Sequence, residues 1–183
     1  MRLFIAIDLP EEVKQVIEEI KEQIKDVKGV KPVRKQNLHL TMKFLGEIEE
    51  DKVNKVVEAL GKVEFNPFKL SINKIGLFPN EKRIRVLWVD AEPAEPLIEL
   101  KKEIDKALPQ FKDDHPFSAH LTFARIKYIA SDEDKKKILE LITNTKIEKK
   151  EFLVDKFKLY KSTLMPEGPV YEVVASFPNT KHL

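Results

Sequence analysis

The stretch Phe4-Ile5-Ala6-Ile7-Asp8 has a counterpart 82 positions later, Val86-Leu87-Trp88-Val89-Asp90, and both are apolar runs closed by an aspartate. The segments 68–77 and 152–160 repeat at the same interval, and in both the apolar alternation changes parity at the same point. Similarity at a fixed interval is typical of a duplicated structural unit. A parity change is what a β-bulge or a sharp bend does to a strand, so we expect one in each segment.

The rest of the chain alternates between helical and strand-like patterns. Apolar residues at the three-and-four spacing of amphipathic helices predict helices over 11–27, 53–60, 97–108 and 138–142. Runs rich in β-branched and aromatic residues predict strands over 3–9, 38–45, 68–77, 84–89, 119–126, 152–160 and 171–177. The turn residues of 78–81 and 165–169 join strand to strand, so we expect hairpins and mixed or antiparallel sheets.

The order strand, helix, strand, helix and long strand therefore occurs twice. We interpret the chain as one α+β domain over residues 1–183, with repeats at about 1–80 and 83–163 and a closing strand over 170–177. Two lobes, each with a sheet and outer helices, would be related by a pseudo-twofold axis around a central cleft. A chain of 183 residues can bury a core without covalent staples.

The composition excludes several kinds of chemistry. The chain has no cysteine, which removes disulfides, thiolate metal sites and cysteine nucleophiles and suits a reducing cytoplasm. The 33 basic residues nearly balance the 31 acidic ones, so any affinity for nucleic acid must come from local patches. The apolar start, residues 1–10, is too short for a signal peptide or a membrane span. We expect a soluble cytoplasmic monomer.

Abundant lysine and glutamate together with the absence of cysteine is the composition reported for hyperthermophile proteins. A solvated, charged surface on a mesophile protein is the alternative interpretation.

Each half of the chain contains a His-apolar-Thr-apolar motif. The motifs are His39-Leu40-Thr41-Met42 and His120-Leu121-Thr122-Phe123, and they occupy equivalent positions in the repeat. Residues i and i+2 of a strand share a face, so each His and Thr would point one way and the apolar residues into the core. If the pseudo-twofold axis brings the polar faces together, two imidazoles and two hydroxyls converge on one cleft. Taken singly, each histidine could instead be an ordinary hydrogen-bonded residue of a strand.

Two opposed imidazoles suit in-line displacement at phosphorus, where one neutral ring takes a proton and one protonated ring gives one. Their ordinary pKa near 6.5 lets both states coexist at physiological pH. A cyclic phosphodiester is activated by ring strain and does not demand a metal. The remaining histidines, His115 and His182, have no accompanying carboxylates at metal-ligand spacing, so we expect neither a metal nor a cofactor.

These residues resemble the two-histidine phosphoesterases, and among them the RNA 2',3'-cyclic phosphodiesterases, also called 2'-5' RNA ligases, of bacteria and archaea. The similarity runs nearly end to end and includes segments 4–10, 37–46, 76–79 and 85–88 and the pattern Ser162, Leu164, Pro166, Gly168 and Tyr171. The resemblance implies a bilobal α+β fold with the cleft between the lobes.

The resemblance also implies an activity: hydrolysis of RNA 2',3'-cyclic phosphate ends to 2'-phosphomonoesters. His39 would be the proton donor and His120 the proton acceptor that activates water, with Thr41 and Thr122 binding the phosphate. The partners would be RNA with such ends, tRNA-derived ends or nucleotides. Two alternatives remain: joining of tRNA halves through a 2'-5' linkage by the reverse reaction, and a nucleotide- or RNA-binding module without catalysis on the same cleft.

Three further residues are candidates for substrate binding. Arg125 resembles a basic residue that the family uses near the phosphate. In a regular strand, however, it faces away from His120, so it reaches the cleft only if the strand bends, and the alternative is a surface ion pair. Lys43 either contacts an RNA backbone or belongs to a solvated face, and the same holds for Lys31, Arg34, Lys35, Lys82, Arg83 and Arg85. Phe78, in a hairpin, is a candidate for stacking on a base, whereas Trp88 is expected in the core.

Overall fold

The computed structural model describes residues 1–178, which form two antiparallel sheets and four α-helices. In chain order the elements are β1 (Arg2–Asp8), α1 (Glu11–Glu22), β2 (Val30–Pro32), the 3₁₀ helix η1 (Lys35–Asn37), β3 (His39–Glu47), α2 (Glu50–Leu60), β4 (Phe68–Asn80), β5 (Arg83–Glu92), α3 (Ala94–Ala107), β6 (His120–Ile126), α4 (Asp132–Asn144), β7 (Lys150–Val154), β8 (Phe157–Met165) and β9 (Gly168–Phe177).

The strand pairing repeats between the two sheets. The first sheet has the order β3-β1-β8-β9 and the second β2-β6-β5-β4-β7. β1 lies between β3 and β8 with Asp8 opposite His39, and β5 lies between β6 and β4 with Asp90 opposite His120. The predicted α+β class and duplicated architecture are thereby confirmed. The limits of the two repeats at 1–80 and 83–163 stay a prediction.

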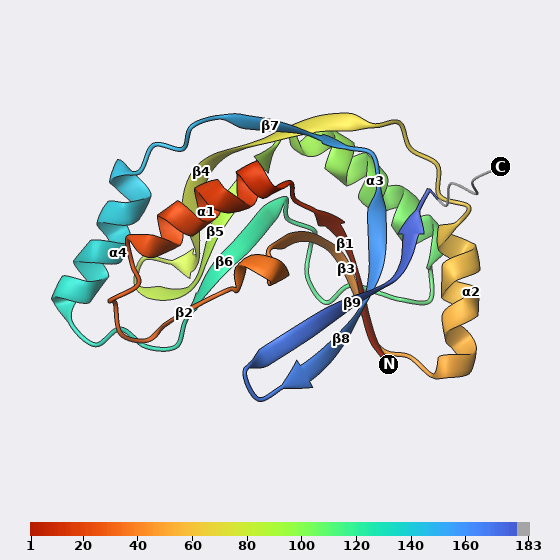
Figure 1. The fold of residues 1–183 in the computed structure, drawn as a ribbon, viewed down its shortest axis with the longest axis horizontal. Coiled ribbons are helices and arrows are strands. Elements are labelled where there is room, and N and C mark those ends of the chain that lie inside the picture. Colours follow the sequence, from red (N-terminus) through yellow and green to blue (C-terminus); the bar gives the residue numbers. More distant parts are fainter. Residues whose placement is uncertain (179–183) are drawn as a thin grey trace.

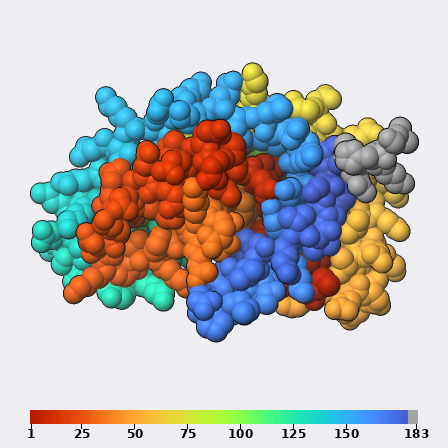
Figure 2. All heavy atoms as spheres, viewed as in Figure 1, coloured from red at the N-terminus to blue at the C-terminus, as the bar shows by residue number. Residues whose placement is uncertain are grey.

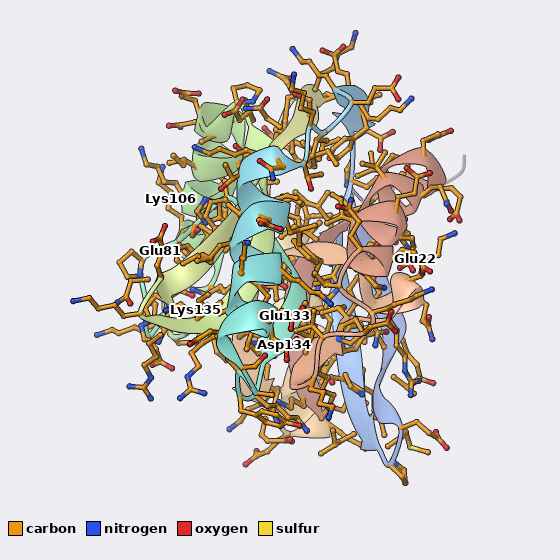
Figure 3. All side chains as sticks on the ribbon, turned by 90° about the vertical axis from the view of Figure 1, so that its left-hand side faces the viewer. Glu22, Glu81, Lys106, Glu133, Asp134 and Lys135 are labelled. Carbon is orange, nitrogen blue, oxygen red and sulfur yellow. The ribbon has the colours of Figure 1, made fainter. Side chains whose placement is uncertain are left out.

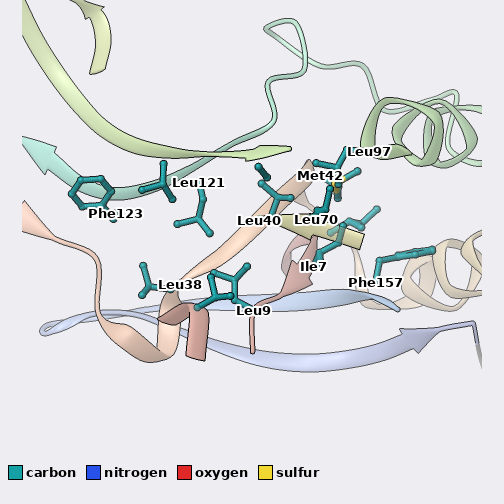
Figure 4. Packing of buried hydrophobic residues seen from close by; sticks show 14 of the residues in the cluster. Ile7, Leu9, Leu38, Leu40, Met42, Leu70, Leu97, Leu121, Phe123 and Phe157 are labelled. Atoms are coloured by element: carbon teal, nitrogen blue, oxygen red, sulfur yellow. The ribbon is translucent and has the colours of Figure 1, made fainter. Parts of the chain in front are cut away.

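Helices from both repeats pack on the second sheet. α1 follows β1 of the first sheet but contacts β6 of the second, to which the next strand, β2, also belongs. α4, from the second repeat, contacts β4 of the same sheet. On the other side of the molecule α2 contacts α3 beside the first sheet (Figure 1). The lobes therefore share one hydrophobic cluster, in which Leu40 and Met42 of β3 lie together with Leu121 and Phe123 of β6 (Figure 4). Neither lobe has a core of its own.

The predicted parity changes fall where the structure is irregular, but the two irregularities differ. In β4 the register shifts between Ile72 and Ile75, and a carboxylate oxygen of Asp90 accepts the N–H groups of Asn73 and Lys74 at 3.0 and 2.8 Å. This is a bulge inside one strand, as expected.

The prediction of a single strand over 152–160 is wrong. The chain leaves the second sheet at Val154 and enters the first at Phe157, so β7 and β8 belong to different sheets. The contacts of Asp8, the counterpart of Asp90, differ as well: it binds the side chains of Lys158 and Tyr160 and not backbone N–H groups.

The helix predicted over 138–142 is longer, Asp132–Asn144, and two further expectations differ from the structure. The first helix ends at Glu22, and the chain continues to Val27 in turns whose N–H groups bond to carbonyls three residues earlier, with Ile24 and Val27 still buried. The apolar residues there keep a helix-like spacing because the successive turns also bury one side of the chain. The strand β2 was not predicted, because three residues are too few to show a period. Both predicted hairpins are present, between β4 and β5 and between β8 and β9.

Charged side chains project from the outer surface, as Glu133, Asp134 and Lys135 do from α4 (Figure 3). Over residues 1–178, each helix is too short or too polar to cross a membrane.

We expect Gly76→Ala to destabilise the protein. Gly76 lies opposite Trp88, and an added Cβ would come within 2.1 Å of the buried indole, which is only 9% exposed. Overpacking of this kind costs about 1–3 kcal/mol, which denaturant unfolding would measure. Gly61→Ala is the matched control, because its nearest neighbours would be at 3.4 Å. Equal stability of the Gly76 variant and the wild type would mean that the indole is free to move.

Candidate active site

Residues of both sheets line one pocket of about 600 Å³, a size typical of sites for small ligands. Both motif pairs, His39 with Thr41 and His120 with Thr122, line it. Arg125 and Lys43 line it as well, together with residues of the 112–118 segment and of the β8–β9 hairpin. The pseudo-twofold axis therefore brings the predicted polar faces to one opening.

A bulge in β6 explains how Arg125 reaches this pocket. The pairing with β5 passes from Thr122 opposite Trp88 to Ala124 opposite Leu87, which leaves Phe123 as an extra residue. The extra residue reverses the parity of the strand. Arg125 thus returns to the face of His120, which is the bend that the sequence interpretation required.

The same bulge occurs in β3, and there it brings an aromatic residue to the pocket. Thr41 lies opposite Ala6 and Lys43 opposite Ile5, so Met42 is the extra residue. Phe44, the counterpart of Arg125, follows the bulge, lines the pocket and is 69% exposed. Phe44 was not predicted as a site residue, although its position in the repeat was a usable signal.

His39 lies among aromatic rings, and one of its two ring nitrogens is hydrogen-bonded to the backbone. The ring centroids of Phe4 and Tyr171 are 5.1 and 5.2 Å from its own, and that of Tyr160 is 6.3 Å away. Its Nδ1 lies 2.5 Å from the carbonyl oxygen of Asn37, which can only accept, so Nδ1 carries a proton and Nε2 remains for a ligand. Burial lowers the pKa of His39 to about 4, against the opposing effects of this carbonyl and of Asp8.

Asp8 supplies a fixed negative charge beside His39. Its carboxylate accepts a hydrogen bond from the hydroxyl of Tyr160 and lies 2.5 Å from the ammonium nitrogen of Lys158. Burial alone would raise the pKa of Asp8, but these bonds outweigh it and hold the pKa below its ordinary value. An ionised Asp8 favours the protonated form of the neighbouring imidazole.

His120 lies on a flat aromatic surface. Its ring stacks on Trp88 with a centroid separation of 3.7 Å and an interplanar angle of 11°, and Phe78 is 5.2 Å away. Its Nδ1 lies 2.5 Å from the hydroxyl oxygen of Ser118. Burial lowers the pKa of His120; Asp90 opposes this shift and Lys74 adds to it. Trp88 is buried, as the sequence predicted, and within residues 1–178 its indole N–H has no hydrogen-bond partner.

Each imidazole is thus oriented by the residue two positions before it, Asn37 in one motif and Ser118 in the other. Neither residue was predicted to have this role. Ser118 could have been found by comparing the flanks of the two motifs. The role of Asn37 could not, because its backbone carbonyl makes the contact.

The other predicted residues have different surroundings. Lys43 is buried, 2% exposed, and its ammonium group contacts the carboxylates of Asp105 and Asp113. Phe78 packs on Trp88 with centroids 5.3 Å apart, does not line the pocket and is 40% exposed.

The hairpin of β8 and β9 is held against the segment before β3. The Arg34 guanidinium donates to the carbonyl of Glu167, and the Asn37 amide donates to that of Pro169 at 3.0 Å. In Figure 2 the hairpin, in blue, and this segment, in orange, lie against each other on one face of the molecule. Because Asn37 also binds His39, the hairpin supports one wall of the pocket and one of its histidines.

No three His, Asp or Glu side chains gather as metal ligands would in the part of the chain that the structure describes. The polar groups that line the pocket include the imidazoles of His39 and His120, the hydroxyls of Thr41 and Thr122 and the guanidinium of Arg125. These groups can bind a phosphate and exchange protons with it.

Comparison with known proteins agrees with this geometry. The family model of LigT like phosphoesterases matches residues 7–88 and again residues 89–171. An RNA 2',3'-cyclic phosphodiesterase of Methanocaldococcus jannaschii is 44% identical over 177 residues, covering 95% of this chain and 98% of the relative. One of Thermotoga maritima is 36% identical over 179 residues, covering 95% and 93%.

Among solved structures, a protein of Thermus thermophilus superposes with a TM-score of 0.80 at 31% identity and 97% coverage of both chains. The LigT of E. coli, solved in complex with 3'-AMP, gives a TM-score of 0.75 at 25% identity and 96% coverage of both. The resemblance inferred from the motifs is confirmed, and this chain belongs to the LigT-like phosphoesterase family.

Proposed function

We propose that this protein hydrolyses 2',3'-cyclic phosphate ends of RNA to 2'-phosphomonoesters. The observation that carries the proposal is the convergence of two His-Thr pairs, on equivalent strands of the two sheets, on one pocket. The curated relatives at 44% and 36% identity, which are RNA 2',3'-cyclic phosphodiesterases, support the same substrate class.

In the proposed reaction His120 takes a proton from a water molecule whose oxygen forms a bond to phosphorus. His39, as an imidazolium, gives the proton on Nε2 to the 3' oxygen as its bond to phosphorus breaks. Thr41 and Thr122 donate hydrogen bonds to the nonbridging oxygens, and the Arg125 guanidinium balances their charge. One water is consumed, one P–O bond forms and one breaks, and both histidines then exchange protons with solvent.

The pKa shifts fit these roles once the substrate charge is included. Without a ligand, burial lowers the pKa of His39 to about 4, so the ring is neutral at pH 7. An anionic phosphate within a few ångströms favours the protonated imidazole and raises that pKa. Asp8 acts in the same direction, because it lies opposite His39 and stays ionised. The substrate thus helps to create the acid that cleaves it.

The pH dependence of kcat/KM should reflect the free enzyme. The reactive form has His39 protonated and His120 neutral, so kcat/KM rises through the lower of their two pKa values and falls through the higher. Because one pKa is about 4 and the other is lowered from 6.5, we expect a bell with its maximum below pH 6.5. In the pH profile of kcat the decrease at high pH should occur at a higher pH than in the profile of kcat/KM, because bound phosphate raises the pKa of His39. A kcat/KM constant up to pH 8 would contradict this assignment.

Substitution of either motif histidine should abolish turnover without unfolding the protein. We expect His39→Ala and His120→Ala each to lower kcat for opening of a 2',3'-cyclic nucleotide by about 10²-fold or more, and Thr41→Ala and Thr122→Ala to cost less. His115→Ala is the matched control, because this exposed histidine lines the same pocket without a paired threonine. Phosphorus NMR would identify the product phosphate as 2' or 3'. Full activity of both motif-histidine variants would refute the proposal.

A further inference from the structure

A cluster of four charged residues, of which three line the pocket, has no part in the proposed reaction. The ammonium nitrogen of Lys43 lies 2.8 Å from a carboxylate oxygen of Asp105 and 3.2 Å from one of Asp113. That of Lys101 lies 2.6 Å from each of the same two oxygens. Two cations therefore share two anions, and the cluster is neutral.

The cations of the cluster are the buried members. The side chains of Lys43 and Lys101 are 1% and 7% exposed, whereas those of Asp105 and Asp113 are 43% and 31% exposed. Burial would lower the pKa of Lys43, but the hydrogen bonds to the two carboxylates outweigh it and raise that pKa. Lys43 thus stays charged, and its charge is neutralised within the protein.

The cluster joins three parts of the fold. Lys43 is on β3, four residues after His39; Lys101 and Asp105 are on α3; and Asp113 lies in the connection between α3 and β6. All of residues 112–118 in this connection line the pocket. The connection ends at Ser118, whose hydroxyl contacts Nδ1 of His120. A bond between Lys43 and Asp113 therefore ties the strand of one histidine to the segment that orients the other.

We propose that Lys43 is a positioning residue: through Asp113 it fixes the 112–118 segment against β3, so that Ser118 holds the His120 ring in register with His39. This inference deepens the proposed function and rests on it. Lys43 would then act on turnover without contacting the phosphate. Its two carboxylate partners leave it poorly suited to bind a second anion, unlike the exposed Arg125.

A buried ion pair need not add to stability, and the role inferred for this one is to fix geometry. The cost of desolvating the charges offsets much of their attraction, whereas removal of one partner leaves a charge uncompensated. Misplacement of a catalytic group by about 1 Å can lower a rate by about 10²-fold. The effect of the cluster should consequently be found in kcat, with KM little changed.

The test compares Lys43→Met, Asp113→Asn and Ser118→Ala, alone and in pairs. We expect each single variant to lower kcat by about 10-fold, and each pair to lower it no further, because the three residues act through one arrangement. Lys102→Met is the control, because Lys102 is on α3 beside Lys101 but its side chain is 61% exposed; its kcat should match that of the wild type. Reductions that multiply in the pairs, or an unchanged kcat for both Lys43→Met and Asp113→Asn, would overturn the inference.

A second readout needs no substrate. The ¹⁵N resonance of the His120 Nδ1 in Lys43→Met should move toward its value in Ser118→Ala, because loss of the contact between Lys43 and Asp113 releases the segment that carries Ser118. An unchanged resonance would overturn the inference even if activity fell. If the wild type failed to open cyclic phosphates, the proposed function would be wrong, while this measurement would still decide whether Lys43 positions His120.

Discussion

Strand pairing across the duplication is the constraint on which the rest of this structure depends. β1 of the first repeat pairs with β8 from the second, and β5 of the second pairs with β4 from the first. Each sheet thus contains strands from both halves, and helix α1, which follows β1 of the first sheet, contacts β6 of the second. The pocket is held at this junction, so neither half could form it alone.

Much of the fold could be predicted, because duplication makes each half a test of the other. Residues with a regular period, such as the helix around Val53 and Val56 and the strands before each motif, were located correctly. What failed depended on tertiary partners. The segment 152–160 divides between two sheets, and Asp8 binds side chains where Asp90 binds backbone; apolar alternation records neither difference.

Part of the site could be predicted from the sequence and part could not. The pairing of His39 and His120 followed from their position in the repeat, and the structure places both in one pocket. The sequence could not tell that a bulge at Phe123 turns Arg125 to the same face, nor that two carboxylates far along the chain neutralise Lys43. Bulges and buried ion pairs arise from contacts that only the folded chain brings together.

The bulges have a consequence for orientation. A pocket formed by two equivalent repeats can bind an asymmetric ligand in two equivalent orientations. Only positions where the residues of the two repeats differ can favour one orientation over the other. Here β3 presents the ring of Phe44 where β6 presents the guanidinium of Arg125. At these matched positions one side is apolar and the other cationic, so a molecule with a flat ring at one end and a negative charge at the other can distinguish the two orientations.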